Sequence, residues 1–302
     1  MIDSRNITVI VIPLIGGAAL DKCLACVPER DVARVVVLRE DMGSSSEWGA
    51  RHSGVVFLNA ARRSVPFRRA VGVSVATTDI VALIEDTSLI HAGWLSALCE
   101  AFGGLDIAGA GGPVRISADL PSRYQALGWT EYGAFGMDRF RLLANGGRIV
   151  LTSRLPGNNF ALRRAFLHDA LQDHDRGLIE TEVCRALGRQ GYRFALHSGM
   201  GVTYAGVDRY GARLATRARH GRLYAGTQAA VSDRLGRATL LAKSLLLPFV
   251  MTARTLTSMA ASGRLAGMAA VVAWVFAMQS AWAVGEAVGA VAGVGRGMEH
   301  WR

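Results

Sequence analysis

The sequence predicts an α/β fold with a mostly parallel sheet flanked by helices, followed by apolar C-terminal helices. Short apolar runs alternate with helix-like segments through the first hundred residues. Three of these runs, Ile7–Ile12, Val32–Leu38 and Ile80–Ile84, are apolar at almost every position, which is typical of strands buried on both faces of a parallel sheet. Strands that alternate with helices in this rhythm indicate parallel strands joined by right-handed crossovers.

The first strand is expected at Ile7–Ile12, closed by Pro13 and a glycine loop before a helix-like segment. The N-terminal apolar run has the length of a signal-peptide core. However, Asp3 and Arg5 flank it, no small-residue cleavage site follows, and Pro13 interrupts it. A first buried strand is therefore the better interpretation.

The second strand ends in a polar, glycine-containing turn that includes Glu40 and Asp41. A short third strand is expected at Val55–Leu58, and a helix or helix-like crossover at Phe67–Val75. This helix carries Arg68 and Arg69, which could contact phosphate or a loop, although a solvated helix face explains them equally well.

The stretch from Val81 to Leu95 is the feature around which the chain is organised. Its buried strand ends in two adjacent carboxylates, Glu85 and Asp86, and a helical segment opens at Gly93. Charge at the end of a buried strand is costly unless it meets a metal or ligand, and this edge is where open α/β sheets bind ligands. The alternative is that both residues only cap the next helix in a solvated loop.

The middle of the chain gives weaker signals. A short strand ending in glycines is expected within Asp106–Val114, whereas residues 120–150 fit either an acceptor lid or an ordinary insertion. LPGNNFALRR at 155–164 is interpreted as a turn leading into a short helix, and 180–187 as a convincing helix. Two histidines and three aspartates between 168 and 175 could suggest a metal, but a solvated loop is the better interpretation.

Four cysteines do not suggest a disulfide framework in a chain of 302 residues. Cys23 and Cys26 form a C-x-x-C, which could be a redox pair or half a zinc site. No second pair stands at metal spacing, and both residues fit one face of a helix. We therefore expect structural core cysteines.

The chain has a net charge of +10, which suits nucleic acid, an anionic membrane surface or phosphorylated ligands. No nucleic-acid-binding signature is present, so nucleic acid is not an expected partner. The arginines are concentrated from Arg209 to Arg237, just ahead of apolar segments at 240–253 and 265–285. The second segment is uncharged and long enough to span a bilayer, and the first is a short span or an interfacial helix.

The order of these motifs resembles the family 2 glycosyltransferases, which are inverting enzymes with a GT-A fold. The resemblance covers roughly residues 7–226 and rests on the motifs VIVIP, VVVLRED-x-G-S, IVALIEDTSLIHAGWL, LPGNNFALRR and ETEVCRALGRQGYRF. Membrane-associated members have a similar C-terminal tail. The resemblance implies a nucleotide-sugar donor and a catalytic domain at 1–226, followed by a membrane-associated helical region at 227–302.

The resemblance also implies roles for individual residues. Glu85, Asp86 and Thr87 fall at the Asp-x-Asp-type site that binds Mg²⁺ or Mn²⁺ and the diphosphate, and Thr87 departs from the usual carboxylate. Glu180 falls at the catalytic base, with Ile179 in place of the preceding glutamate. Pro13, Glu40 and Asp41 fall where the family contacts base and ribose, and Arg69 is added as a candidate contact to the donor phosphate. Tyr204 stands where many members have a histidine.

The mechanism that these residues suggest is glycosyl transfer with inversion. It needs a base on the acceptor hydroxyl and stabilisation of the departing diphosphate. We expect a membrane-associated enzyme that acts on a lipid-linked or cell-envelope glycan, with its catalytic domain facing the cytoplasm and one or two membrane helices. The alternatives are an inactive GT-A-like scaffold or nucleotide-binding protein, and a nucleotidyltransferase, whose lysine-bearing loop after the first strand is absent.

Overall fold

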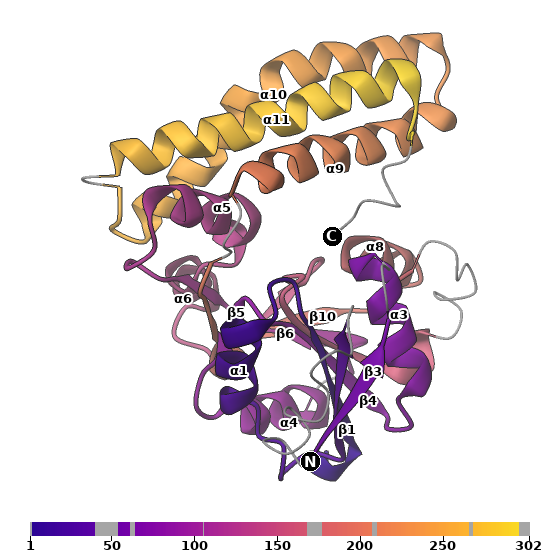
Figure 1. Cartoon of the computed structure of the whole chain (residues 1–302), viewed down its shortest axis with the longest axis vertical. Helices are drawn as coiled ribbons and strands as arrows, with labels where there is room; N and C mark the ends of the chain where they lie inside the picture. Colours follow the sequence, from indigo (N-terminus) through magenta and orange to yellow (C-terminus); the bar gives the residue numbers. More distant parts are fainter. Residues whose placement is uncertain are drawn as a thin grey trace. The chain divides into compact units, whose positions relative to one another are not determined.

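A computed structural model describes residues 2–39, 54–60, 64–104, 106–167, 177–206, 210–265 and 268–295 (Figure 1). The chain divides into two compact units. The first, which we call the α/β unit, comprises Met1–Arg115 and Met137–Ala205. The second, the helical unit, comprises Ile116–Gly136 and Gly206–Arg302.

An eight-stranded sheet forms the centre of the α/β unit, with strand order β3-β2-β1-β4-β9-β6-β10-β8. The strands are β1 Ile7–Ile12, β2 Arg34–Arg39, β3 Val55–Asn59, β4 Ile80–Glu85, β6 Gly109–Gly111, β8 Ile149–Thr152, β9 Asn159–Arg163 and β10 Phe194–His197. The first three predicted strands and the Ile80 strand are present within a few residues of their expected bounds. Every residue of β1 and of β4 is buried, as their apolar runs predict.

Strand β9 corrects a sequence expectation. The segment after the PGNN turn is an extended strand followed by a short 3-10 helix, η3 Arg164–Phe166, and not an apolar-basic helix. β9 runs antiparallel to both β4 and β6, whereas β1 is parallel to β2 and β4. Its start therefore lies at the edge of the sheet where β1 and β4 end.

A smaller sheet has the strand order β5-β11-β7, from β5 Ser88–Ile90, β7 Val114–Ile116 and β11 Val202–Tyr204. The helices of the α/β unit are α1 Gly17–Cys26, α3 Val65–Val75, α4 Trp94–Gly104, α6 Met137–Ala144 and α8 Glu180–Arg189. Short 3-10 helices lie at η1 Ser4–Asn6 and η4 Ser198–Met200. Gly72 brings α3 close to β1, because a Cβ there would lie 2.7 Å from Ile10 Cγ2.

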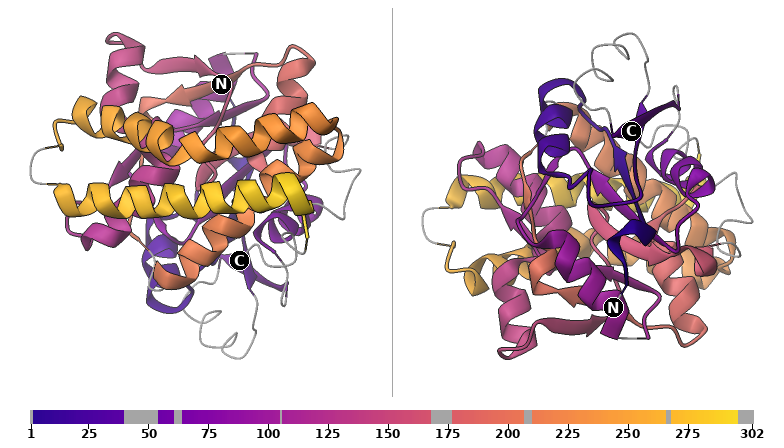
Figure 2. Two further views of the ribbon diagram at one scale, coloured as in Figure 1. Left: turned by 90° about the horizontal axis from the view of Figure 1, so that it is seen from above. Right: turned by 90° about the horizontal axis from the view of Figure 1, so that it is seen from below.

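The helical unit contains α5 Ser122–Tyr132, α9 Tyr210–Ala230, α10 Arg234–Ala261 and α11 Ala269–Ala292, with a short η2 at Gly133–Phe135. Both apolar segments singled out in the sequence lie mostly within α10 and α11. These two helices are long and apolar enough to cross a membrane. Figure 2 shows α10 and α11 side by side along their lengths.

The division into units was not predicted in this form. The expected boundary at residue 226 falls inside α9, and segment 116–136 belongs to the helical unit although it interrupts the α/β unit in sequence. Where the catalytic part of the chain ends remains a prediction.

Candidate active site

The candidate site lies at the edge of the large sheet where β1 and β4 end and β9 begins. Ile12 and Glu85 are paired at the ends of the parallel strands β1 and β4. Asn159 opens β9 on the other side of β4, opposite Ile84. Three chain segments that are distant in sequence therefore bring polar residues to one edge, as expected for an open α/β sheet.

A buried arginine joins the two predicted key carboxylates of this edge. Arg69 Nη2 donates to Glu85 Oε1 at 2.9 Å, and Arg69 Nη1 donates to Glu180 Oε2 at 2.6 Å. Nη2 also donates to the carbonyl oxygen of Gly157 at 2.8 Å. The Arg69 side chain is 4% exposed, so the solvated helix face that the sequence allowed for Arg68 and Arg69 is wrong for both residues.

One buried guanidinium, that of Arg69, therefore contacts two carboxylates, those of Glu85 and Glu180. Breaking either ion pair would leave a buried charged group less well compensated, so Arg69 fixes both side chains at this edge.

Backbone contacts between α3 and the start of α8 explain why Arg69 reaches Glu180. The amide of Leu178 donates to the carbonyl of Pro66 at 2.8 Å. Gly177 has a φ of +69°, and a Cβ there would lie 2.4 Å from the Pro66 carbonyl carbon. Only glycine permits this approach together with a left-handed conformation. Glu180 then begins α8, with Ile179 as the N-terminal flanking residue.

Asp86 has a structural role in the loop after β1. Its Oδ1 accepts the amide of Leu14 at 2.8 Å, its Oδ2 accepts those of Ile15 at 3.1 Å and Gly16 at 2.7 Å, and its side chain is buried. Desolvation raises the pKa of Asp86, while these backbone donors lower it. Both carboxylate oxygens are thus engaged, and Asp86 holds the Leu14–Gly16 loop against the end of β4.

The predicted metal set fits a divalent ion only in part. Within the described residues no group of three or more His, Cys, Asp or Glu side chains could hold a metal ion. Glu85 supplies one carboxylate, and Thr87 places a buried hydroxyl, without a hydrogen-bond partner, at the third predicted position. Mg²⁺ is often bound by one or two carboxylates, with water and substrate phosphates completing its shell. Glu85 and Thr87 therefore remain compatible with such an ion, whereas both oxygens of Asp86 already accept backbone hydrogen bonds, and its role as a metal ligand stays a prediction.

The PGNN turn organises this edge in a way that sequence reasoning missed. Asn158 Nδ2 donates to Ser88 Oγ at 2.9 Å, and its backbone carbonyl accepts the amide of Glu85 at 3.3 Å. Asn159 accepts the indole N–H of Trp94 at 2.9 Å and donates to the carbonyl of Met200 at 2.6 Å. Both asparagines are fully buried. The signal that could have revealed them was the adjacent pair of amides, which a simple turn does not require.

The remaining predicted donor contacts are only partly described. The carbonyl oxygen of Pro13 accepts a hydrogen bond from Arg68 Nη1 at 2.5 Å, which ties the end of β1 to α3. Glu40 and Asp41 lie outside the described residues, as does the histidine–aspartate stretch from 168 to 175. Tyr204 is buried at the end of β11.

The expectation that both cysteines of the C-x-x-C motif are core residues is confirmed for Cys23 and wrong for Cys26. Cys23 is buried on α1, whereas Cys26 is exposed. Desolvation by burial raises the pKa of the Cys23 thiol most, and the negative charge of Asp86 raises it further. A protonated, buried thiol is a poor nucleophile and metal ligand.

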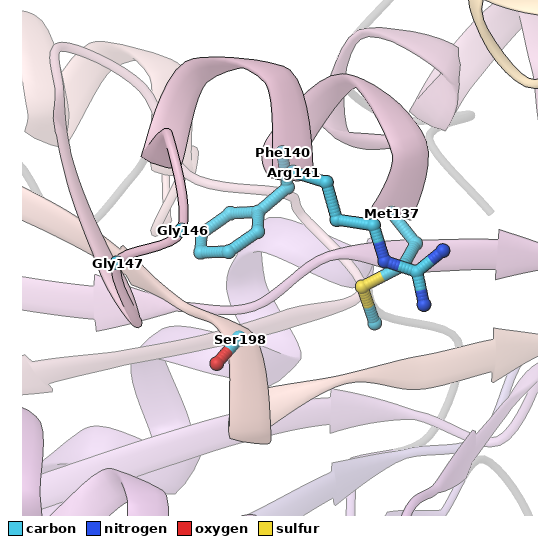
Figure 3. A pocket seen from close by; sticks show the side chains of 6 residues that line it. All are labelled: Met137, Phe140, Arg141, Gly146, Gly147 and Ser198. Atoms are coloured by element: carbon cyan, nitrogen blue, oxygen red, sulfur yellow. The ribbon is translucent and has the colours of Figure 1, made fainter.

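A hollow of about 360 Å³ lies elsewhere in the α/β unit (Figure 3). Phe140 and Arg141 of α6 face it from one side, and Ser198 from the other. It contains none of the predicted site residues. Residues 120–150, for which either an acceptor lid or an ordinary insertion was expected, contain α5 and α6, which belong to different units.

Comparison with known proteins identifies the fold. No protein-family model matches the sequence, and no curated protein matches it. Among solved structures, the mannosyltransferase PcManGT from Pyrobaculum calidifontis, in complex with GDP-Man and Mn²⁺, is similar with a TM-score of 0.56 and 17% identity. The match covers 93% of this chain and 86% of that chain. The α/β architecture is a GT-A fold.

A second similar structure is GalNAc-T7 with UDP, GalNAc and Mn²⁺, with a TM-score of 0.50 and 13% identity. This match covers 67% of this chain and 44% of that chain, so this chain spans less than half of GalNAc-T7. Both neighbours were solved with nucleotides or nucleotide sugars and Mn²⁺. At these identities the likeness establishes the fold, and the predicted fold class is confirmed.

Proposed function

We propose that this protein is an inverting glycosyltransferase that moves a sugar from a nucleotide-diphosphate donor to a lipid-linked or cell-envelope glycan. The observation that carries the proposal is the Glu85–Arg69–Glu180 cluster at the ligand-binding edge of a GT-A fold. It holds a donor-site carboxylate and a base candidate in fixed relation, and such positioning can supply a large part of a rate enhancement.

Glu180 is the general base of the proposed reaction. Its side chain is 18% exposed, so an acceptor hydroxyl can reach it, and Arg69 binds Oε2. Oε1, which lies close to the backbone of Gly157, is then the atom that takes the hydroxyl proton as the acceptor oxygen attacks the anomeric carbon. The bond from that carbon to the diphosphate breaks on the opposite face, which inverts the configuration.

Glu85 and Thr87 are the residues that would hold Mg²⁺ or Mn²⁺. The ion would supply positive charge to the departing diphosphate. The carboxylate of Glu85 and the buried hydroxyl of Thr87 are oxygen groups of the kind that these ions prefer. Pro13, Glu40, Asp41 and Arg69 remain the proposed surroundings of the donor, and Asp86 contributes by fixing the loop after β1.

The helical unit attaches the enzyme to the cytoplasmic membrane in this proposal. α10 and α11 supply the apolar surface, and the arginine-rich sequence before them favours a cytoplasmic position for the catalytic domain. An enzyme held there would meet cytoplasmic nucleotide sugars on one side and lipid-linked acceptors on the other.

A second candidate function is a GT-A-like scaffold that binds a nucleotide without transferring a sugar. The replacements Thr87 and Ile179, and the engaged oxygens of Asp86, favour it. The two functions differ in turnover and not in fold.

The experiment that separates them is a transfer assay. Purified protein in detergent would be incubated with radiolabelled nucleotide sugars, a cellular lipid extract and Mn²⁺, beside Glu180→Gln and the matched surface variant Glu182→Gln. Transfer by wild type and Glu182→Gln, but not by Glu180→Gln, is the expected result, and NMR of the product should show an inverted anomer. Nucleotide binding without transfer would support the scaffold.

A further inference from the structure

We propose that α10 and α11 lie flat in one leaflet of an anionic membrane and that neither helix crosses it. This inference rests on the membrane association proposed above and adds how the helical unit binds. The occupant of its apolar surface is a lipid leaflet whose phosphate headgroups meet basic side chains along α10.

The polarity of α10 is inverted relative to a helix of a water-soluble protein. Its large apolar side chains point outward: Leu245 is 72% exposed, and Leu246 and Phe249 are each 64% exposed. Its buried face includes Ser244, Thr252, Thr255 and Ser258. Apolar side chains of this size belong against hydrocarbon, and small polar residues are common where membrane helices pack together.

α11 continues the same apolar surface. The rings of Phe249 on α10 and Phe276 on α11 lie with their centroids 5.5 Å apart. Further along α11, Val284 is 61% and Val291 69% exposed, while the polar Glu286 is buried. The two helices form an antiparallel hairpin and lie side by side in Figure 2. Large apolar side chains of both helices are exposed on it.

Close approaches at glycine positions show the direction of α9 relative to α11. A Cβ on Gly285 would lie 1.9 Å from the carbonyl oxygen of Ala218, and one on Gly289 would lie 2.3 Å from that of Arg222. A Cβ on Gly226 would lie 2.7 Å from the carbonyl carbon of Gly293. These contacts advance by four residues on both helices, so α9 and α11 run in the same direction with touching backbones.

The chain before α9 and the chain after α10 both contact the start of segment 116–136. After α10, Arg264 Nη1 donates to the carbonyl of Ile116 at 2.7 Å. Before α9, a Cβ on Gly206 would lie 2.8 Å from Leu120 Cδ2. Ile116 and Leu120 are four residues apart, so α9 leads away from segment 116–136 and α10 leads back to it.

This path means that α10 can cross a membrane only if α9 crosses it too. α9 carries Arg213, Arg217, Arg219 and Arg222, and an arginine at the centre of a bilayer is energetically costly even by insertion-based scales. Since α9 cannot cross at that cost, neither can α10. α11, whose C-terminal half is packed along α9, is then held on the same side.

The charges of α10 fit the same arrangement. Lys243 and Arg254 are both exposed and bound an uncharged stretch of about 16 Å at 1.5 Å per residue, roughly half the hydrocarbon thickness. Together with the exposed Arg234 and Arg237 they provide basic groups beside the apolar face. A helix with this pattern lies in the interface and prefers anionic lipids.

Labelling of the two helix connections tests the topology. Val231→Cys precedes α10 and Ala261→Cys ends it, and both positions are exposed. In sealed inside-out and right-side-out vesicles, a membrane-impermeant maleimide should label both cysteines from the side that labels the native exposed Cys26. Labelling of 231 and 261 from opposite sides would overturn the proposal. The other native cysteines are buried and serve as internal controls.

Depth measurement provides a second test. Leu235→Cys, Leu246→Cys and Thr257→Cys place a fluorophore at three exposed positions separated by eleven residues, hence on one face of α10. Quenching by nitroxide lipids in phosphatidylglycerol vesicles should report one shallow depth for all three. Depths that differ by about 16 Å between neighbours would demonstrate a span. If the protein floats with the vesicles, but the fluorophores are not quenched and the cysteines cross-link between copies, then a second copy of the chain covers the apolar surface of α10 and α11. That result would overturn the proposal. Failure to float would instead contradict membrane association itself.

Discussion

Glu85 and Glu180 accept hydrogen bonds from the same guanidinium group, that of Arg69. One residue ends strand β4 and the other begins helix α8, so two parts of the chain that are far apart in sequence are fixed to each other through a planar group. A bidentate guanidinium sets both distance and orientation, which a flexible ammonium cannot do. Any movement of the donor-site carboxylate therefore reaches the proposed base directly.

Arg69→Lys should lower the rate of sugar transfer by roughly 100-fold, because lysine cannot hold both carboxylates in the same geometry. Nucleotide binding should be affected less than turnover. The measurement is kcat and KM for transfer, with Arg185→Lys on the exposed face of α8 as the matched control. Equal kcat in both variants would show that Arg69 does not position the base.

Glu180→Gln should reduce transfer by roughly 10²–10⁴-fold while the donor still binds, because the amide cannot accept the acceptor proton. Glu182 lies in the same first turn of α8 and is exposed, so Glu182→Gln should transfer at the wild-type rate. Full activity of Glu180→Gln would remove this residue from the mechanism.

Asp86→Ala should destabilise the protein by about 2 kcal/mol or more, because it leaves the amides of Leu14, Ile15 and Gly16 without their acceptor. Urea denaturation followed by circular dichroism measures this loss. Mn²⁺ affinity should be measured without urea, at a temperature where the variant is folded. It should fall much less in Asp86→Ala than in Glu85→Gln. A stable Asp86→Ala variant that no longer binds Mn²⁺ would restore Asp86 as a metal ligand.

His197 should make the α/β unit less stable in acid. Its Nδ1 accepts the amide of Gly199 at 3.0 Å, and desolvation lowers its pKa, partly opposed by Glu100. Below a pH of about 6.5 the unfolded chain binds a proton that the folded state resists, so the free energy of unfolding should fall by at most about 1.4 kcal/mol per pH unit. Denaturation at several pH values checks this slope, which His197→Gln should reduce. An unchanged slope would argue for a charged His197.

Gly285→Ala should destabilise the helical unit by about 1–3 kcal/mol, because the new methyl group would meet the backbone of Ala218. Thermal unfolding in detergent measures the effect. Val284 is exposed on the neighbouring position, and Val284→Ala should change the transition little. Similar transitions for the two variants would contradict the close packing of α9 on α11.

The sequence was sufficient for those parts of the fold whose residues carry a strong local pattern. Ile80–Ile84 is apolar throughout and was predicted as a buried strand, and the apolar C-terminal segments were predicted as membrane-spanning or interfacial helices. Asn159–Arg163 lacked such a pattern. Its strand conformation depends on pairing with β4 and β6, which are distant in the chain.

The sequence indicated which residues lie near the ends of strand β4 and helix α8. It did not indicate which side chains or amides those residues contact. Glu85 and Glu180 were assigned from the family resemblance, and their roles stay predictions. A charged residue on a helix, such as Arg69, gives no local sign that it will be buried between them. The backbone contacts of Asp86 were not predicted for the same reason, since its neighbours along the chain do not reveal the amides of Leu14–Gly16. Segment 116–136 likewise joins the helical unit through contacts that no local pattern encodes.

Calorimetric titration with nucleoside diphosphates, with and without Mn²⁺, tests the central claim most directly. The detergent-solubilised full chain would be compared with Glu85→Gln and with the surface variant Glu182→Gln. We predict saturable binding of one nucleotide that Mn²⁺ strengthens, weakened in Glu85→Gln and unchanged in Glu182→Gln. Folded protein that binds no nucleotide under any of these conditions would contradict the assignment as a nucleotide-sugar glycosyltransferase.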